Sequence, residues 1–375
     1  MSPSCGDTVG NVMWDTVCRP MSASRAPARR LRRRSALAVA LAGAAAGVAL
    51  TERRHLRSIA ADPDLRALSE PLGGRPLDGV VSLDGTCLHA ERFGGAGGDG
   101  IPQSTLLLAH GWTEQLSLWG PVIRRLAGPD LSIVAYDLRG HGASDEAADG
   151  DYALERFGED LESVLAAGAP DPSRTAVAGH SLGAMSIAAW AAAHDVTARV
   201  AAAALINTGL DDLIGGTLVF GELGARLVPS WLGRALLRSS RPMLPVSTPL
   251  SQAITRHVAF GPEATAGAIA FYERMLLDTD AGVRGATGIA LSTLDLSAAV
   301  SRITVPTLVI TGDHDRLTPP AHARRIAAAL PTPAGVLELE RTGHMSPLER
   351  PDEVAGALRG LLADVATAPE PTAAG

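Results

Sequence analysis

The stretch TAVAGHSLG, residues 175–183, decides the fold that this sequence predicts. An apolar run leads into the pattern G-x-S-x-G, and an Ala-rich run with helical character follows it. A strand, a tight turn with serine at its apex and a helix together form a nucleophile elbow. Gly179 and Gly183, on either side of His180-Ser181-Leu182, carry no side chains that would clash in such a turn. The pattern predicts that Ser181 presents its hydroxyl at the end of a buried strand.

Short apolar runs alternate with amphipathic runs on both sides of this stretch. The predicted strands are Thr105–Ala109, Ser132–Tyr136, Thr175–Gly179, Val200–Ile206, Thr307–Thr311 and Gly335–Leu339. The predicted helices are Leu116–Leu126, Ala153–Ala167, Leu182–His194, Ala321–Leu330 and Pro351–Leu362. Asp84-Gly85, between Gly79–Leu83 and Thr86–Arg92, predicts a β-hairpin before them. This order is typical of a mainly parallel sheet with helices on both faces and an antiparallel edge.

One region, from about Leu210 to Asp295, contains no clear strand and reads as several helices interrupted by prolines. A helical insertion between two strands predicts a cap over the carboxyl edge of the sheet, where open α/β sheets bind ligands. Phe220, Trp231 and Phe271 either line a substrate pocket beneath this cap or pack its own core. The predicted divisions are an N-terminal segment (1–57), a linker (58–78), a core (79–209 and 299–365), a cap (210–298) and a disordered tail (366–375).

The composition excludes several classes of protein. Apolar residues make up 46% of the 375 residues and charged residues 19%, which excludes a disordered chain, a collagen and a disulfide mini-protein. All 33 basic residues are arginine, and ten lie within residues 1–57. The remainder carries 23 arginines against 37 acidic residues, which argues against nucleic-acid binding. The three cysteines have no zinc-binding spacing, and Cys87 is expected to be a core thiol because it lies in an apolar stretch.

The N-terminal segment has the form of a targeting sequence. Six arginines between Arg25 and Arg34 precede an uncharged, Ala/Gly-rich run, Ala36–Leu50. A basic region followed by a short apolar run is typical of an export signal or a signal anchor, so residues 36–50 predict membrane association or export. The alternative is an extension upstream of a start at Met21, which would leave the protein cytoplasmic.

A serine hydroxyl needs a base, and the chain order expected around such an elbow is serine, acid, histidine. His344 lies in a loop just after the last predicted strand, from which it can reach Ser181. Asp313 and Asp315 both follow the strand Thr307–Thr311. Asp313 occupies the tight turn, where aspartate commonly bonds its own backbone. Asp315 is therefore the predicted acid.

An acyl-transfer site also needs two backbone N–H groups that bind the developing oxyanion. One is the amide of Leu182, directly after the nucleophile. The other is expected in His110-Gly111-Trp112, after the strand Thr105–Ala109, with the Trp112 amide as donor. The Trp112 ring is also a candidate for lining the pocket, and His110 is interpreted as structural.

These motifs make the sequence resemble the α/β-hydrolase family, in particular its lid-bearing esterases, monoacylglycerol lipases and cofactor-free haloperoxidases. The resemblance rests on His110–Trp112, Asp137–Asp145, the Ser181 elbow, Gly312–Asp315 and Gly343-His344, and it spans about residues 79–365. It implies an eight-stranded, mostly parallel sheet with a cap after the sixth strand. It also implies that Asp137–Asp145 is structural, and serine in place of aspartate at the elbow excludes epoxide hydrolases and dehalogenases.

The expected activity is hydrolysis of a small carboxylic ester with an apolar acyl or alcohol group, by Ser181, His344 and Asp315. The same residues would serve acyl transfer to an alcohol, perhydrolysis, or thioester and carbon–carbon hydrolysis, and a ligand receptor of this fold is a further alternative. No Gly-rich phosphate loop, dinucleotide fingerprint or metal-ligand pattern occurs in the sequence, so no cofactor or metal is predicted. The oligomeric state is left open.

Overall fold

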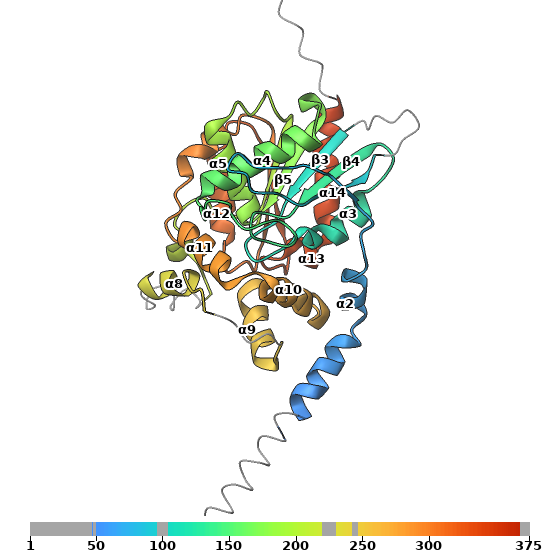
Figure 1. The fold of residues 1–375 in the computed structure, drawn as a ribbon, viewed down its shortest axis with the longest axis vertical. Coiled ribbons are helices and arrows are strands. Elements are labelled where there is room, and N and C mark those ends of the chain that lie inside the picture. Colours follow the sequence, from blue (N-terminus) through green and yellow to red (C-terminus); the bar gives the residue numbers. More distant parts are fainter. Residues whose placement is uncertain (1–46, 48–49, 96–103, 220–229, 242–246, 368–375) are drawn as a thin grey trace, which may run out of the picture. The chain divides into compact units, whose positions relative to one another are not determined.

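The computed structural model describes residue 47 and residues 50–95, 104–219, 230–241 and 247–367. The chain divides into two compact units, residues 1–53 and 54–375, and the elements labelled in Figure 1 belong to the second. Apart from residues 47 and 50, the predicted anchor lies outside the described residues and stays a prediction. Within the described part of the chain, no helix has both the length and the apolar character needed to cross a bilayer.

Eight strands form one sheet in the order β1-β2-β4-β3-β5-β6-β7-β8. They are β1 (Arg75–Pro76), β2 (Ala90–Gly94), β3 (Ser104–Ala109), β4 (Leu131–Tyr136), β5 (Thr175–His180), β6 (Ala202–Ile206), β7 (Thr307–Gly312) and β8 (Pro333–Leu339). β2 pairs antiparallel with β1 and β4, and all other pairs are parallel. This confirms the predicted sheet, and the six predicted strands correspond to β3 to β8.

The start of the domain differs from the prediction. The expected hairpin is reduced to one bridge, between Val81 and Cys87, and the edge of the sheet is formed by β1 instead. The prediction of a core thiol at Cys87 is wrong, because this side chain is exposed. Thr86 and Leu88 are both buried, so the alternation of side chains along an extended chain turns Cys87 outward.

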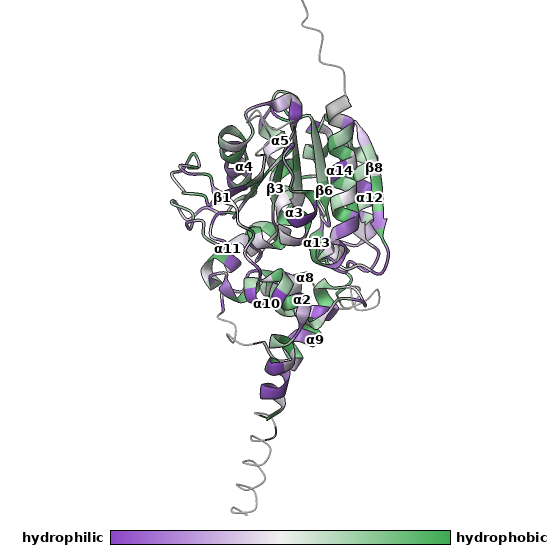
Figure 2. Ribbon diagram, turned by 90° about the vertical axis from the view of Figure 1, so that its right-hand side faces the viewer, coloured by the Kyte–Doolittle hydropathy of each residue, from purple (hydrophilic) through white to green (hydrophobic). Residues whose placement is uncertain are grey.

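Helices cover both faces of the sheet, and alternate residues of the strands pack against them. On β3, Leu107 and Ala109 belong to the hydrophobic cluster that includes α4 and α5, whereas Leu106 and Leu108 belong to the cluster that includes α3 and α14. Figure 2 shows the hydrophobic colour along the central strands between these layers. The helices are η1 (Leu116–Trp119), α3 (Gly120–Leu126), α4 (Leu154–Gly168), η2 (Pro172–Arg174), α5 (Leu182–Ala193), α12 (Pro320–Ala329), α13 (Ser346–Glu349) and α14 (Pro351–Thr367).

Between β6 and β7 the described residues form a helical insertion (Figure 1). Its elements are α6 (Leu213–Gly216), α8 (Ser230–Leu237), α9 (Pro249–Ala259), α10 (Ala266–Asp278), α11 (Ala281–Leu291) and η3 (Ser297–Arg302). The segment expected as a linker contains α2 (Pro63–Leu68), which packs on α10. There the Gly267 N–H donates to Asp62 Oδ2 at 3.0 Å, and a Cβ on Gly267 would lie 2.6 Å from the Leu65 nitrogen. The segment that contains α2 is therefore part of the packed structure.

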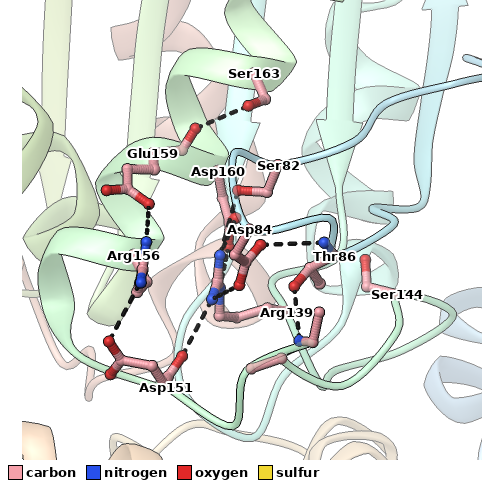
Figure 3. Close-up of polar contacts among 12 residues, drawn as sticks. Ser82, Asp84, Thr86, Arg139, Ser144, Asp151, Arg156, Glu159, Asp160 and Ser163 are labelled. Atoms are coloured by element: carbon pink, nitrogen blue, oxygen red, sulfur yellow. Dashed lines mark hydrogen bonds and ion pairs between the residues drawn. The ribbon is translucent and has the colours of Figure 1, made fainter.

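A buried arginine organises the loop that follows β4 (Figure 3). Arg139 is fully buried and bonds Asp160 through Nε at 2.7 Å and Nη2 at 2.6 Å. Its Nη1 donates to Asp84 Oδ2 at 2.9 Å and to the Asp151 carbonyl at 3.1 Å, and Nη2 also approaches Ser82 Oγ at 3.3 Å. All five N–H groups of the guanidinium thus find acceptors, which a buried charge requires. This arrangement supports the structural role expected for the loop.

Candidate active site

Ser181 lies between β5 and α5, at the carboxyl edge of the sheet. Its backbone has φ 50° and ψ −113°, a region that residues with a side chain rarely adopt. A Cβ on Gly179 would lie 2.4 Å from the Ala184 nitrogen, and one on Gly183 would lie 2.3 Å from the Ala109 oxygen. The turn thus requires glycine at both positions and holds Ser181 in a strained conformation.

This strain predicts that Ser181→Gly is more stable than the natural protein, by about 1 kcal/mol. A side chain in a sparsely populated backbone region costs on the order of 1–3 kcal/mol, and glycine returns roughly 0.5–1 kcal/mol of this through its larger unfolded-state entropy. Urea denaturation measures the difference. Ser181→Ala is the matched control, because it removes the hydroxyl and keeps the Cβ. If the turn stores no strain, Ser181→Gly should instead be less stable than Ser181→Ala by roughly 0.5–1 kcal/mol, the entropy cost of glycine.

His344 and Asp315 follow the neighbouring strands β8 and β7, and the structure brings them together. His344 Nδ1 lies 2.8 Å from Asp315 Oδ2, and both residues are buried. Burial raises the pKa of Asp315, but the charge and hydrogen bond of His344 and the Asn207 hydrogen bond lower it more, so this pKa lies below its usual value. The carboxylate accepts, so Nδ1 carries a proton, and in the neutral ring the lone pair is then on Nε2. Such an imidazole can act as a base.

Asp315 has other donors that hold it in place. Oδ1 accepts from the backbone N–H groups of Leu317 and Thr318, both at 2.9 Å. Oδ2 accepts from Thr318 Oγ1 at 2.9 Å and Asn207 Nδ2 at 3.0 Å. Asp313 instead accepts from the Thr342 N–H at 3.0 Å and pairs with its exposed neighbour His314. The sequence reasoning did not identify Asn207, although an asparagine directly after the buried strand β6 is a signal for this edge.

The loop that carries His344 is fastened to the helical insertion. The His344 N–H donates to the Ala259 carbonyl at 2.8 Å. Glu349 accepts from the N–H groups of Gly343 at 3.0 Å and Gly261 at 2.8 Å. Burial raises the pKa of Glu349 to about 7, against the effect of these two hydrogen bonds. The end of α9 therefore fixes the backbone on which His344 is placed.

The two predicted oxyanion donors flank the serine. Leu182 is the first residue of α5, and Trp112 follows the carboxyl end of β3, next to the elbow in the sheet order. Neither backbone N–H has an acceptor among the described residues. Gly111, before Trp112, donates its own N–H to Glu114 Oε2 at 2.5 Å. The Trp112 and Leu182 amides are therefore available to a bound oxygen.

A cavity of about 370 Å³ contains Ser181 and His344 in its wall. Its other lining residues are mainly apolar: Trp112, Glu114, Met185, Leu213, Ile214, Thr217, Val219, Gly233, Leu237, Val258, Tyr272, Leu291, Leu317, Thr318 and Met345. Several come from α8, α9, α10 and α11, so the helical insertion forms much of the wall. A cavity of this kind suits an apolar group beside the serine.

The structure describes three of the four predicted pocket residues, and one of these three lines this cavity. Trp112 lines it. Phe271 instead lines a different cavity, between α10 and the segment that follows α2, and its neighbour Tyr272 lines the cavity that contains Ser181. Trp231 is 65% exposed, because Gly233 and Leu237 put the opposite side of α8 toward the cavity. Phe220 lies outside the described residues. The described residues contain no cluster of three or more side chains suited to a metal ion.

Known proteins match this chain over most of its length. The family model described as the alpha/beta hydrolase fold matches residues 104–351. The chain is 30% identical over 270 residues to a pimeloyl-[acyl-carrier protein] methyl ester esterase of Stenotrophomonas maltophilia, covering 70% of this chain and 94% of that protein. It is 28% identical over 249 residues to a monoacylglycerol lipase of Mycolicibacterium smegmatis, covering 62% and 81%.

A solved structure agrees with the fold. An esterase from Exiguobacterium antarcticum superposes with a TM-score of 0.63 at 19% identity, covering 77% of this chain and 99% of that one. The sheet order, the helical insertion after β6 and the family match lead to one assignment. The chain belongs to the α/β-hydrolase fold family and is an enzyme of the hydrolase class.

Proposed function

We propose that this hydrolase cleaves carboxylic esters through Ser181, His344 and Asp315, by way of an acyl-enzyme. The observation that carries the proposal is the Asp315–His344 hydrogen bond of 2.8 Å, with His344 and Ser181 in the wall of one cavity. A relative named as a methyl ester esterase and another named as a monoacylglycerol lipase support an ester substrate.

The residues supply each step of such a reaction. The Ser181 hydroxyl attacks the acyl carbon and gives its proton to His344 Nε2. Asp315 keeps the Nδ1 proton in place and stabilises the imidazolium. The Trp112 and Leu182 amides bind the oxyanion. The intermediate collapses to the acyl-enzyme as the imidazolium protonates the leaving alcohol, and a water molecule, deprotonated by His344, then releases the acid.

The cavity wall indicates the acyl group. Leu213, Ile214, Leu237 and Leu291 supply apolar surface from the insertion, and Met185 supplies it from α5. Burying apolar surface contributes roughly 25 cal/mol per Å². The substrate is therefore an ester with an apolar acyl or alcohol portion that fits about 370 Å³.

Turnover of p-nitrophenyl esters from acetate to palmitate by the full chain tests this function. We expect an optimum at an intermediate chain length, because acetate leaves the apolar wall uncovered and p-nitrophenyl palmitate exceeds the cavity volume of about 370 Å³. Absence of ester turnover above that of Ser181→Ala across the series would contradict the proposal. Product analysis with an added alcohol or hydrogen peroxide then separates hydrolysis from acyl transfer and perhydrolysis.

Changing the size of Leu237 should move this optimum. We expect Leu237→Ala to favour longer acyl chains and Leu237→Phe to favour shorter ones, because Leu237 lines the cavity. Leu232→Ala is the matched control, since Leu232 is on the same helix but is 37% exposed and is not part of the wall. The ratio of kcat/KM between two ester lengths is the measurement. An equal shift in the Leu232 variant would mean that the cavity does not bind the acyl group.

A further inference from the structure

Two buried titratable side chains connect the three backbone segments of the proposed site. Glu114 and His180 are each at most 1% exposed. Glu114 Oε2 accepts from the Gly111 N–H at 2.5 Å and lies 3.0 Å from His180 Nδ1. His180 Nε2 lies 2.8 Å from the carbonyl oxygen of His344. Glu114 and His180 therefore connect three segments: residues 110–112, which carry the predicted oxyanion donor and are called the oxyanion segment, the turn that carries Ser181, and the backbone of His344.

Hydrogen-bond chemistry determines where the protons lie. A carbonyl oxygen only accepts, so His180 Nε2 carries a proton, and Nδ1 shares another with the Glu114 carboxylate. Burial lowers the pKa of His180, but the charge and hydrogen bond of Glu114 and the His344 carbonyl raise it more, so it lies above the usual value. With an acceptor at each ring nitrogen, imidazolium is the form of His180 that these contacts stabilise.

His110, a second buried histidine beside the same segment, has the opposite character. Its Nε2 accepts from the Leu138 N–H at 3.0 Å, and its Nδ1 donates to the Gly111 carbonyl at 2.8 Å. One accepting and one donating nitrogen define a neutral ring. Burial lowers the pKa of His110, as do the nearby His141 and His180. Gly111 therefore bonds a neutral ring through its C=O and the Glu114 carboxylate through its N–H.

We propose that Glu114 and His180 are positioning residues: their ion pair holds the oxyanion segment and His344 in register with Ser181. The pair acts through the backbone of Gly111 and His344 and takes no proton from the substrate. Glu114 also lines the cavity, but its Oε2 atom is hydrogen-bonded to Gly111 and His180. This inference rests on the proposed ester hydrolysis and adds to it the coupling between the oxyanion donor and the base.

The kinetic test uses Glu114→Gln, His180→Gln and the double variant. In Glu114→Gln the new amide oxygen can still accept from Gly111 but carries no charge, so His180 loses its second proton. The neutral ring then has one N–H for two acceptors, the amide oxygen and the His344 carbonyl. We expect kcat to fall about 10²-fold with KM changed by less, because displacements of about 1 Å cost that much. The double variant should be no slower than the slower single variant, because the pair acts as a unit.

Glu273→Gln is the matched control. Glu273 is 3% exposed and accepts from Ser247 Oγ at 2.5 Å and Thr255 Oγ1 at 3.0 Å, within the insertion. Its variant should keep kcat, with the melting temperature of every variant measured alongside. An unchanged kcat in Glu114→Gln, or an equal loss in Glu273→Gln, would overturn the positioning role.

The charge state of His180 is tested without any variant of the pair. Long-range ¹H–¹⁵N spectra of the natural protein at pH 6.5, the ordinary pKa of histidine, should show His180 mainly with both nitrogens protonated and His110 mainly as a neutral ring. A neutral His180 would overturn the inference. The proposed function has a separate test, because it fails if Ser181→Ala retains ester turnover. That result would not change the measured charge state of His180.

Discussion

Replacing Ser181 by alanine is expected to lower kcat on ester substrates by on the order of 10⁶-fold, because residues of a nucleophile–base–acid unit fail together when one is lost. The remaining cavity and the Trp112 and Leu182 amides would still bind an ester, but no group is placed to form the acyl-enzyme. The alanine variant keeps the backbone turn and the apolar wall. We therefore expect KM to change far less than kcat.

Two measurements make this result decisive. Mass spectrometry after exposure to a phosphonylating reagent or to a slowly hydrolysed ester should show one adduct on the natural protein and none on the Ser181 variant. The melting temperature should stay close to that of the natural protein, because the backbone strain is the same in both. Retained turnover in a folded Ser181→Ala variant would show that another group attacks the ester.

The sequence predicts most of what lies along the chain and less of what depends on packing. The elbow, six strands of the sheet and the pairing of Asp315 with His344 are predictable, because each depends on a local pattern and on chain order. Their aromatic residue type predicts Trp231 and Phe271 in the pocket, but in the structure neither lines the cavity that contains Ser181. Which side of α8 or α10 faces the cavity depends on how these helices dock, and that information is not local.

The buried polar contacts around the site show the same limit. Glu114 is 66 residues from His180 in the sequence, and Asn207 is 108 residues from Asp315, yet each pair is in hydrogen-bond contact. The parallel sheet brings these loops together at one edge, so the contacts follow from the topology. Glu349 likewise joins Gly261 and Gly343 only after the insertion has folded onto the sheet. Motifs identify the reacting groups, whereas the fold determines what supports them.

Asp315→Asn is expected to lower kcat by about 10⁴-fold, because it imposes the wrong tautomer on His344. The backbone N–H groups of Leu317 and Thr318 only donate, so they retain the amide oxygen of the new asparagine. Its NH₂ group then faces His344 Nδ1, which must accept. His344 Nε2 consequently carries the proton and cannot take one from Ser181. The new NH₂ also faces Asn207 Nδ2, whose amide is fixed by Ser346 and Gly343.

The free energy of unfolding should depend on pH, and the lowered pKa of Asp315 determines the direction of the change. The pKa of Asp315 is lowered in the folded protein, so its carboxylate contributes stability above the unfolded pKa and loses it as pH falls through the folded pKa. Asp315→Asn is then less stable than the natural protein at neutral pH, and the difference narrows in acid. Urea denaturation at several pH values measures this.

Asp313→Asn is the matched control, two residues away on the same loop. Asp313 bonds the Thr342 backbone and His314, not His344, so its variant should keep most of its turnover. A larger loss of kcat in Asp313→Asn than in Asp315→Asn would transfer the role of the acid to Asp313. Because both variants exchange one carboxylate for one amide, the difference between them reports on the buried contacts that Asp315 makes and Asp313 does not, namely those with His344, Asn207 and Thr318.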